Sequence, residues 1–229
     1  MLNAKLNAAK SVIPLIPAHG AIGLGSGSTI AVFAKELGSL NAEGNVAVQV
    51  VPSSYQAYQL AVEFEIPLTN LDLNPSLLLT VDGADEVDRN LNLTKGGGGA
   101  LFQEKIIASA SEKLVIIVDE SKLVDRLATK FDIPIEVLPL ALGPVKKKIN
   151  QMGIVPALRM AQKKMGPVVT DNGNFLLDLR FKEPIEDPAR VAIDLKMIPG
   201  VVETGLFVNM ADEVHIGSES GVRILKKQE

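Results

Sequence analysis

The sequence predicts an α/β protein, in which a parallel β-sheet covered by helices on both faces is joined to a smaller α+β domain. Two observations predict this class. Short apolar runs alternate with helical segments in the first half of the chain, which is the order of a parallel sheet with crossover helices. After about Leu127 the order becomes strand, helix, strand, strand, helix, strand, which matches a ferredoxin-like arrangement.

The composition fits a globular protein that acts on a small molecule. The 229 residues are 47% apolar and 22% charged, which is enough to bury a substantial core. The net charge of -4 argues against nucleic acids and anionic membranes as main partners, because phosphate backbones require a basic surface. The chain has no cysteine and only His19 and His215, which excludes thiolate chemistry and disfavours a histidine-rich metal site. It shows neither a signal-peptide pattern nor an apolar run of ~20 residues, so we expect a cytoplasmic location.

The first half of the chain predicts a helix from Leu2 to about Ile16, followed by alternating strands and helices. The expected strands are Ala21–Leu24, Val46–Val51, Leu77–Val81 and Leu114–Val118. The expected helices are residues 30–37, which Gly38 should stop, residues 55–64, and a helix that starts near Ala100 and carries Glu104. The loops after the strands should converge at the carboxyl edge of the sheet, where such sheets bind ligands.

The second half predicts the βαββαβ order. The expected elements are a strand over 133–138, a helix over 145–152 opened by Pro144, strands over 155–160 and 175–181, a helix over 189–197 and a strand from Val201. Asn172-Gly173 predicts a tight turn, and Asp187-Pro188 predicts a helix N-cap with proline at the first helical position. Two final strands, 214–216 and 222–225, should return to the first domain. We therefore expect one domain over 1–127 plus 206–229 and another over 128–205.

The turn after the first strand combines glycines with hydroxyl side chains. A dinucleotide fingerprint would need glycine at Ser28 and an acidic residue at the end of the second strand, and a P-loop would need a lysine after the glycines. A helix N-terminus with unpaired N–H groups and nearby hydroxyls suits a single phosphate instead. A turn that only lets strand and helix pack closely is the alternative. The residues predicted to bind phosphate are Ser26, Gly27, Ser28 and Thr29.

Two aspartates follow the third strand, in the segment Asp82-Gly83-Ala84-Asp85. Carboxylates at this edge of a sheet can exchange protons with substrate hydroxyls, or they can bind Mg²⁺. In the plainer interpretation, Asp82 only caps the Asp-Gly turn and Asp85 is solvated. The segment taken alone leaves both interpretations open.

Lys95 precedes the glycines Gly96, Gly97, Gly98 and Gly99. Glycine costs roughly 0.5–1 kcal/mol relative to alanine wherever the chain is ordered, so four in a row need a reason. A flexible linker would be one, but loops between a buried strand and a helix are usually short and ordered. We therefore predict that this backbone approaches a ligand closely, and that Lys95 and the exposed N–H groups form an oxyanion site.

Glu104 is the candidate general base. On the expected helix its neighbours one turn away are all apolar, namely Ala100, Leu101, Ile107 and Ala108. Desolvation on such a stripe should raise the pKa of the carboxyl toward neutrality, which suits a base at physiological pH. Alternatively, Glu104 pairs with a lysine such as Lys105 or faces water.

Two lysines are candidate phosphate partners, Lys122 just after the fourth strand and Lys5 in the first helix. Taken alone, each is better explained as a surface lysine. No role is assigned to either histidine, because nothing nearby in the sequence would orient it.

Six motifs lie in order over nearly the whole chain, namely GLGSGST, VDGADEVD, KGGGGALFQEKI, DESKLVD, VVTDNGN and IPGVVETGLF. Together they resemble the type A family of ribose-5-phosphate isomerases. The resemblance implies interconversion of D-ribose 5-phosphate and D-ribulose 5-phosphate in the non-oxidative pentose phosphate pathway, with no cofactor and no metal. It also implies a Rossmann-like catalytic domain with a smaller ferredoxin-like domain, and a homodimer or higher homo-oligomer.

Residue by residue, the resemblance makes Glu104 the proton acceptor. The substrate-binding segments fall on Ser26–Thr29, Asp82–Asp85 and Lys95–Gly98, with Lys122 and the phosphate-contacting Lys5. Gly99 stands where some members have alanine, and we expect no consequence. In the implied chemistry Glu104 moves a proton between two carbons through an enediolate, and Lys95 with the loop N–H groups holds the oxyanion. We expect Asp82 to assist ring opening and Asp85 to move the proton between the two oxygens, and the opposite assignment of these two roles stays open.

Two functions from other classes compete with this one. A sugar-phosphate sensor could use the same loops, but no basic helix-turn-helix pattern precedes Gly23. A magnesium-dependent phosphotransferase could use Asp82, Asp85 and Asp88. Chelation of metal ions and isotope exchange into the substrate would separate these alternatives.

Overall fold

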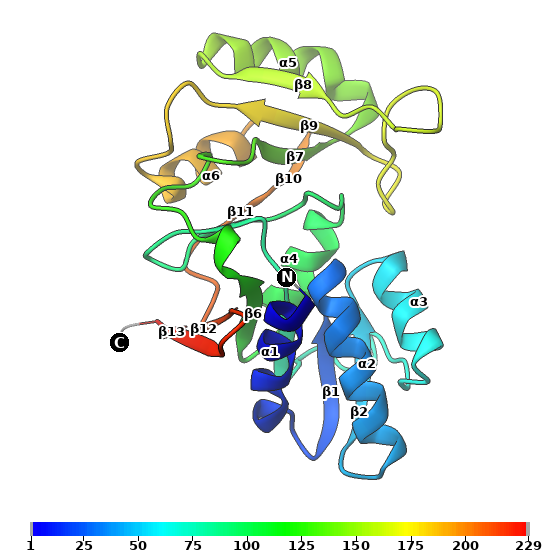
Figure 1. The fold of residues 1–229 in the computed structure, drawn as a ribbon. Helices are drawn as coiled ribbons and strands as arrows, with labels where there is room; N and C mark the ends of the chain where they lie inside the picture. Colours follow the sequence, from blue (N-terminus) through cyan, green and yellow to red (C-terminus); the bar gives the residue numbers. More distant parts are fainter. Residues whose placement is uncertain (1, 228–229) are drawn as a thin grey trace. The chain divides into compact units, whose positions relative to one another are not determined.

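The computed structural model describes residues 2–227, and Figure 1 shows the course of the chain. Its contacts divide the chain into two compact units. Unit 1 comprises Met1–Ala84, Gln103–Lys122 and Met210–Glu229, and unit 2 comprises Asp85–Phe102 and Leu123–Asn209. The division expected from the sequence, 1–127 plus 206–229 and 128–205, stays a prediction.

Unit 1 is built around a six-stranded sheet with the order β13-β12-β6-β3-β1-β2. Its strands are β1 (His19–Leu24), β2 (Ala47–Pro52), β3 (Leu79–Asp82), β6 (Leu114–Asp119), β12 (Glu213–Gly217) and β13 (Val222–Lys226). Neighbouring strands run parallel, except that β13 pairs antiparallel with β12. The predicted α/β class and the return of the last strands to this sheet are both confirmed.

Helices cover both faces of this sheet, as predicted. They are α1 (Leu2–Val12), extended by the 3₁₀ turn Ile13–Leu15, α2 (Ser28–Ala42), α3 (Tyr55–Glu63) and α4 (Leu101–Ser109). Side chains alternate along β1, so Ile22 and Leu24 pack with α1, α2 and α3, whereas Ala21 packs with Ile107 of α4 on the opposite face.

The expectation that Gly38 stops its helix is wrong, because α2 continues to Ala42. A Cβ at Gly38 would lie 2.4 Å from the carbonyl oxygen of Phe64, the residue after α3. Glycine is therefore present because α2 approaches this backbone closely, and the packing of the helix compensates for its poor helix propensity.

The order of strands places the candidate residues at one edge of unit 1. β1 lies between β2 and β3, so the direction in which the chain adds strands reverses at β1. Such a reversal opens a crevice at the carboxyl ends of the strands. Because α4 connects the parallel strands β3 and β6, it runs back along the sheet, and its first turn, with Glu104, lies at this same edge.

A charge network around the buried Glu213 joins the last two strands, β12 and β13, to the rest of unit 1. Glu213 of β12 accepts hydrogen bonds from Lys113 (2.8 Å) and contacts Lys226 (3.2 Å) and the Nε2 of His215 (3.1 Å). The Nδ1 of His215 lies 2.7 Å from the Oγ of Ser11 in α1. Burial would raise the pKa of Glu213, but its hydrogen bonds with Lys113, His215 and Lys226 outweigh burial and lower the pKa to about 2.

Because of this network, the free energy of unfolding should depend on pH in the acid range. The folded pKa of Glu213 lies below its ordinary value of 4.5, so its stabilising contribution is complete above about pH 4.5 and is lost as pH falls toward 2. A tenfold change in proton affinity corresponds to ~1.4 kcal/mol, so the contribution to the free energy of unfolding reaches up to about 3 kcal/mol. We expect Glu213→Gln to flatten the pH dependence of the free energy of unfolding in this window, as measured by urea titration at several pH values. Parallel curves for the variant and the native protein would contradict the assignment.

Unit 2 contains a four-stranded antiparallel sheet with the order β10-β7-β9-β8. Its elements are β7 (Ile133–Val137), α5 (Leu142–Gln151), β8 (Val155–Leu158), β9 (Phe175–Arg180), α6 (Pro188–Lys196) and β10 (Val201–Thr204). The predicted βαββαβ order is confirmed, and the strand order is that of a ferredoxin-like sheet. The two helices cover one face, over a core that includes Ile135, Leu177 and Leu195.

Both predicted local signals of unit 2 are confirmed. The Asp187 side chain accepts a hydrogen bond from the N–H of Arg190, with Pro188 at the first helical position. The chain reverses between Thr170 and Asn174, whose backbones are hydrogen-bonded (2.9 Å), and Gly173 there adopts a φ of +80°.

The short elements of unit 2 were not predicted from the sequence. A three-stranded sheet joins β4 (Glu86–Val87), β5 (Leu93–Thr94) and β11 (Leu206–Phe207), and the 3₁₀ turn Pro139–Ala141 precedes α5. The buried Glu86 carboxylate accepts hydrogen bonds from the N–H groups of Ala128, Lys130 and Phe131. Strands of two residues are too short to show a period of hydrophobicity, so this sheet had no signal in the sequence.

Across residues 2–227, none of the helices has the length and apolar character needed to cross a membrane.

Candidate active site

The predicted phosphate turn begins where β1 ends, and α2 starts at Ser28. Gly27 adopts a φ of +105° before the helix, a conformation that glycine enters without steric cost. The turn is anchored by its neighbours. The Ser26 hydroxyl lies 2.9 and 2.7 Å from the hydroxyls of Ser53 and Ser54, and the N–H of Gly27 donates to the Oε1 of Gln56 (2.9 Å). The first N–H groups of α2 are thus presented at a turn that other residues hold in place.

Asp82 joins this turn to the end of β3. Its Oδ1 accepts hydrogen bonds from the N–H groups of Ser26 (3.1 Å) and Gly83 (2.7 Å), and the residue is only 1% exposed. A Cβ at Gly25 would lie 2.1 Å from the same oxygen, so only glycine fits there. The turn-capping role of Asp82 is therefore present, and the same carboxylate also fixes the position of the phosphate turn.

The two candidate lysines of unit 1 both lie close enough to Asp119, at the end of β6, to act on its carboxylate. The Nζ of Lys5 donates to the Oγ of Ser28 (2.8 Å). Lys122 ends a 3₁₀ turn, Glu120–Lys122, directly after β6. Burial would raise the pKa of Asp119, but its hydrogen bonds with Ser121 and the charges of Lys122 and Lys5 outweigh burial and lower it. Both lysines thus act on a carboxylate at the carboxyl edge of the sheet.

Glu104 lies in the first turn of α4 and is 5% exposed. Ile107 and Ala108, on the same side of the helix, are also buried. The alternative in which Glu104 faces water is therefore wrong, and its predicted burial beside apolar neighbours on the helix is confirmed, whereas pairing with a lysine such as Lys105 stays an alternative. A buried carboxylate at the carboxyl edge of a parallel sheet has the position expected of a proton acceptor.

In unit 2, Lys95 is held in a buried position, with 3% of its surface exposed. Its N–H donates to the carbonyl of Gly205 (2.8 Å), and a Cβ at Gly205 would lie 2.3 Å from the carbonyl oxygen of Lys95. Its Nζ lies 5.5 Å from the centre of the Phe207 ring, within the range of a cation–π interaction.

The glycines after Lys95 form an ordered turn, so the flexible-linker alternative is wrong. The N–H of Gly99 donates to the carbonyl of Gly96 (3.0 Å), and Gly96 has a φ of +104°. The N–H of Gly97 donates to the Oδ2 of Asp85 (2.7 Å), and a Cβ at Gly97 would lie 2.6 Å from the other Asp85 oxygen. The turn therefore leaves no room for a side chain at Gly97, and Asp85 is bonded to it.

The structure groups the predicted residues within each unit. Unit 1 brings together the turn Ser26–Thr29, Asp82, Gly83 and Lys5, and unit 2 brings together Asp85 and the segment Lys95–Gly98. Ala84 and Asp85 are consecutive in the chain and stand at the boundary of the two units. Among residues 2–227 no three or more His, Asp or Glu side chains are grouped so that they could hold a metal ion.

Several residues that shape the site were not predicted from the sequence. Ser53, Ser54 and Gln56 hold the phosphate turn, and the only signal for them was two serines after the second strand, where an acidic residue was sought. Arg159, which follows β8, contacts the glycine turn and pairs with Asp178 of β9, and neither residue had a local signal.

Comparison with known proteins identifies the family. The model of the family described as ribose 5-phosphate isomerase A (phosphoriboisomerase A) matches residues 49–221. Over 224 residues the chain is 49% identical to a ribose-5-phosphate isomerase of Dictyostelium discoideum, covering 95% of this chain and 94% of that one. It is 46% identical over 221 residues to a ribose-5-phosphate isomerase A of Pyrococcus abyssi, covering 96% of each chain.

Solved structures agree with this result. The structure of ribose 5-phosphate isomerase A from Methanocaldococcus jannaschii has a TM-score of 0.94 and 42% identity, covering 99% of each chain. A D-ribose-5-phosphate isomerase in complex with phospho-erythronic acid has a TM-score of 0.95 and 45% identity, covering 97% of each chain. Family model, relatives and structures all point the same way: the chain belongs to the ribose 5-phosphate isomerase A family.

Proposed function

We propose that this chain interconverts D-ribose 5-phosphate and D-ribulose 5-phosphate through an enediolate, with the residues predicted above in the roles set out here. Membership of the family makes the chain an aldose-ketose isomerase of the non-oxidative pentose phosphate pathway. The observation that carries the proposal at the level of residues is the buried Glu104 in the first turn of α4, at the carboxyl edge of the sheet.

The ligand of the related structure has the right chemistry for such a site. Phospho-erythronic acid, bound by that relative, carries a phosphate at one end and a carboxylate at the other. A carboxylate imitates the planar, negatively charged oxygens of an enediolate, and inhibitors of this kind bind sites that are built for the intermediate. A site that takes such a ligand needs one subsite for phosphate and one for an oxyanion.

Unit 1 supplies the phosphate subsite in this proposal. Ser28 and Thr29 offer N–H groups at the start of α2, and the turn through Ser26 and Gly27 brings further hydroxyls to the same place. Lys5 and Lys122 add positive charge. The helix dipole and the unpaired N–H groups of the first turn both favour an anion there.

Glu104 and the segments around Asp82 and Lys95 carry the proton chemistry. Glu104 takes the proton from one carbon and returns it to the next, while Lys95 and the turn of Gly96, Gly97 and Gly98, through the N–H of Gly98, stabilise the oxygen that becomes negative. Asp85, which is only partly buried, moves the proton between the two oxygens, and Asp82 assists ring opening. The substrate also contacts the backbone of Gly83 and Ala84. No cofactor or metal takes part.

The proposal extends to assembly and location. We assign the chain to the cytoplasm, where its sugar phosphate substrates are found, and expect it to form a homodimer or a higher homo-oligomer. Its net charge of -4 gives it no affinity for nucleic acid or for anionic membranes.

Isotope exchange tests the reaction directly. When the protein turns over ribose 5-phosphate in D₂O, we expect NMR to show deuterium at the carbon next to the carbonyl, because the base that removes the carbon-bound proton to form the enediolate exchanges it with solvent before returning it to carbon. Treatment with EDTA should leave the rate unchanged, whereas a magnesium-dependent phosphotransferase would stop. Binding of the sugar without any exchange of carbon-bound hydrogen would contradict the proposal and favour a sugar-phosphate sensor.

A further inference from the structure

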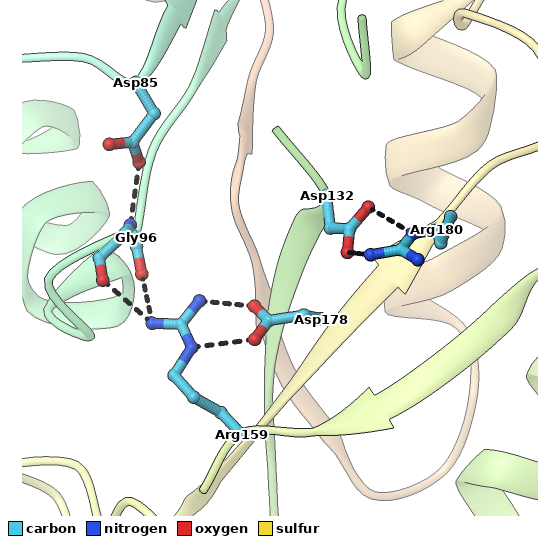
Figure 2. Close-up of polar contacts among 7 residues, drawn as sticks. Asp85, Gly96, Asp132, Arg159, Asp178 and Arg180 are labelled. Carbon is cyan, nitrogen blue, oxygen red and sulfur yellow. Dashed lines mark hydrogen bonds and ion pairs between the residues drawn. The ribbon is translucent and has the colours of Figure 1, made fainter. Parts of the chain in front are cut away.

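Arg159 lies at the glycine turn of unit 2 and has no part in the reaction as described so far. It follows β8, and its guanidinium lies between Asp178 and the glycine turn (Figure 2). There its Nη1 donates to the carbonyl oxygens of Gly96 (2.8 Å) and Gly97 (3.0 Å). A single side chain thus holds two consecutive carbonyls of the turn.

The guanidinium is itself fixed by Asp178 of β9. Its Nε donates to the Oδ2 of Asp178 (2.9 Å), and its Nη2 donates to the Oδ1. Such a two-bonded arginine–carboxylate pair defines both the position and the plane of the guanidinium. With two bonds to Asp178 and two to the turn, four of the five N–H donors of Arg159 are used within the protein, which leaves little capacity to bind a substrate directly.

The contacts of Arg159 determine which way the N–H groups of the turn point. In a trans peptide unit the carbonyl and the N–H point in opposite directions. The unit between Gly96 and Gly97 is held at both ends, since its carbonyl accepts from Arg159 and its N–H donates to Asp85 (2.7 Å). The next unit is held by its carbonyl alone, so the N–H of Gly98 points away from Arg159.

The Gly98 N–H is therefore the one that the turn presents. Gly98 is exposed, and within residues 2–227 its N–H has no hydrogen-bond partner. A Cβ at this position would meet no atom within 4 Å, so the backbone faces open space. The positive charge on the carbonyl side also polarises the peptide unit and strengthens its N–H as a donor.

We propose that Arg159 is a positioning residue, which with Asp178 aims the N–H of Gly98 at the negatively charged oxygen of the reaction intermediate. The inference rests on the proposed function, in which the glycine turn stabilises the oxyanion. Donors of this kind contribute only when they are aimed before the charge develops.

Arg159→Met tests the inference, and Arg180→Met is its matched control. Arg180 also pairs with an aspartate through two bonds, to Asp132 (3.2 and 3.1 Å), but has no contact with the glycine turn (Figure 2). We expect Arg159→Met to lower kcat by about 10- to 100-fold with a small change in KM, because misaimed donors affect the intermediate more than the substrate. Arg180→Met should retain the native kcat.

Hydrogen exchange provides a readout that does not depend on turnover. Loss of Arg159 should free the peptide unit of Gly97, so we expect its amide proton to exchange at least ~10-fold faster by NMR, with other amides of unit 2 unchanged. Asp178→Asn should give a smaller effect of the same kind, since the guanidinium stays but loses its charged partner. If Arg159→Met does not fold, Arg159→Lys keeps a positive charge but cannot bond Asp178 and both carbonyls together, and should show the same loss.

Two outcomes would overturn the inference. One is a folded Arg159 variant with native kcat and native exchange at Gly97, and the other is an equal loss of kcat in Arg180→Met. Failure of the proposed function would look different, because the unmodified protein would then exchange no deuterium into ribose 5-phosphate, whatever the state of Arg159.

Discussion

Glu104→Gln should abolish most of the activity while leaving substrate binding intact. Glutamine has nearly the same shape as glutamate, so the packing of the first turn of α4 is preserved, but its amide cannot accept the proton from carbon. General-base catalysis contributes ~10²–10⁴ in rate, and we expect kcat to fall by at least that factor. The measurement is the rate of ribulose 5-phosphate formation, together with calorimetric binding of ribose 5-phosphate.

A second carboxylate on a helix of unit 1 provides the control. Glu36 of α2 is partly exposed and lies 3.9 Å from Lys10. Glu36→Gln removes one negative charge from the same unit without touching any residue assigned to the reaction, so its kcat should be native. Near-native turnover by Glu104→Gln, or an equal loss in both variants, would show that Glu104 is not the base.

The deuterium experiment separates chemistry from binding in the same variant. If Glu104 is the base, Glu104→Gln should bind ribose 5-phosphate and yet incorporate deuterium at a rate reduced as much as kcat. If deuterium exchange stayed fast while product formation was slow, another group would remove the proton and Glu104 would act later in the reaction.

Local patterns in the sequence predicted the parts of the site that depend on neighbours in the chain. The helix of Glu104 and its burial followed from apolar residues spaced by one turn, and both are present. The ordered glycine turn followed from its place between a strand and a helix. Such inferences succeed because helix periodicity and turn chemistry are properties of a few consecutive residues.

Contacts between distant segments were beyond the reach of these patterns. Arg159 contacts Gly96, 63 positions away, and the Ser26 hydroxyl contacts Ser53, 27 positions away. An isolated arginine or serine carries no signal of such a partner, because only the strand order and register bring the two segments together. The prediction that Gly38 ends its helix was wrong for a related reason. Glycine is accommodated within α2 because the Phe64 backbone, distant in sequence, packs closely against it.

Gly25→Ala should damage both stability and activity, because it forces apart the two segments that Asp82 joins. The new Cβ would lie 2.1 Å from the Oδ1 of Asp82 and 2.6 Å from its Cα, and the latter is a backbone atom that cannot turn away. Overpacking of this kind costs about 1–3 kcal/mol of the free energy of unfolding. The displaced carboxylate would also release the N–H of Ser26 in the phosphate turn. A shift of ~1 Å in a positioning group can cost ~10²-fold, so we expect kcat/KM to fall by about that factor.

The control for this change is a glycine at which an added Cβ would contact no other atom. A Cβ at Gly143, in the first turn of α5, would find no atom within 4 Å, so Gly143→Ala should keep native activity and change the free energy of unfolding by less than about 1 kcal/mol. Urea unfolding and the kinetics of ribulose 5-phosphate formation measure both effects. Because the phosphate lies far along the substrate from the reacting carbons, a displaced phosphate turn should raise KM as well as lower kcat, whereas Glu104→Gln should lower kcat alone. Native KM in a folded Gly25→Ala protein would therefore mean that the turn held by Asp82 does not bind the phosphate.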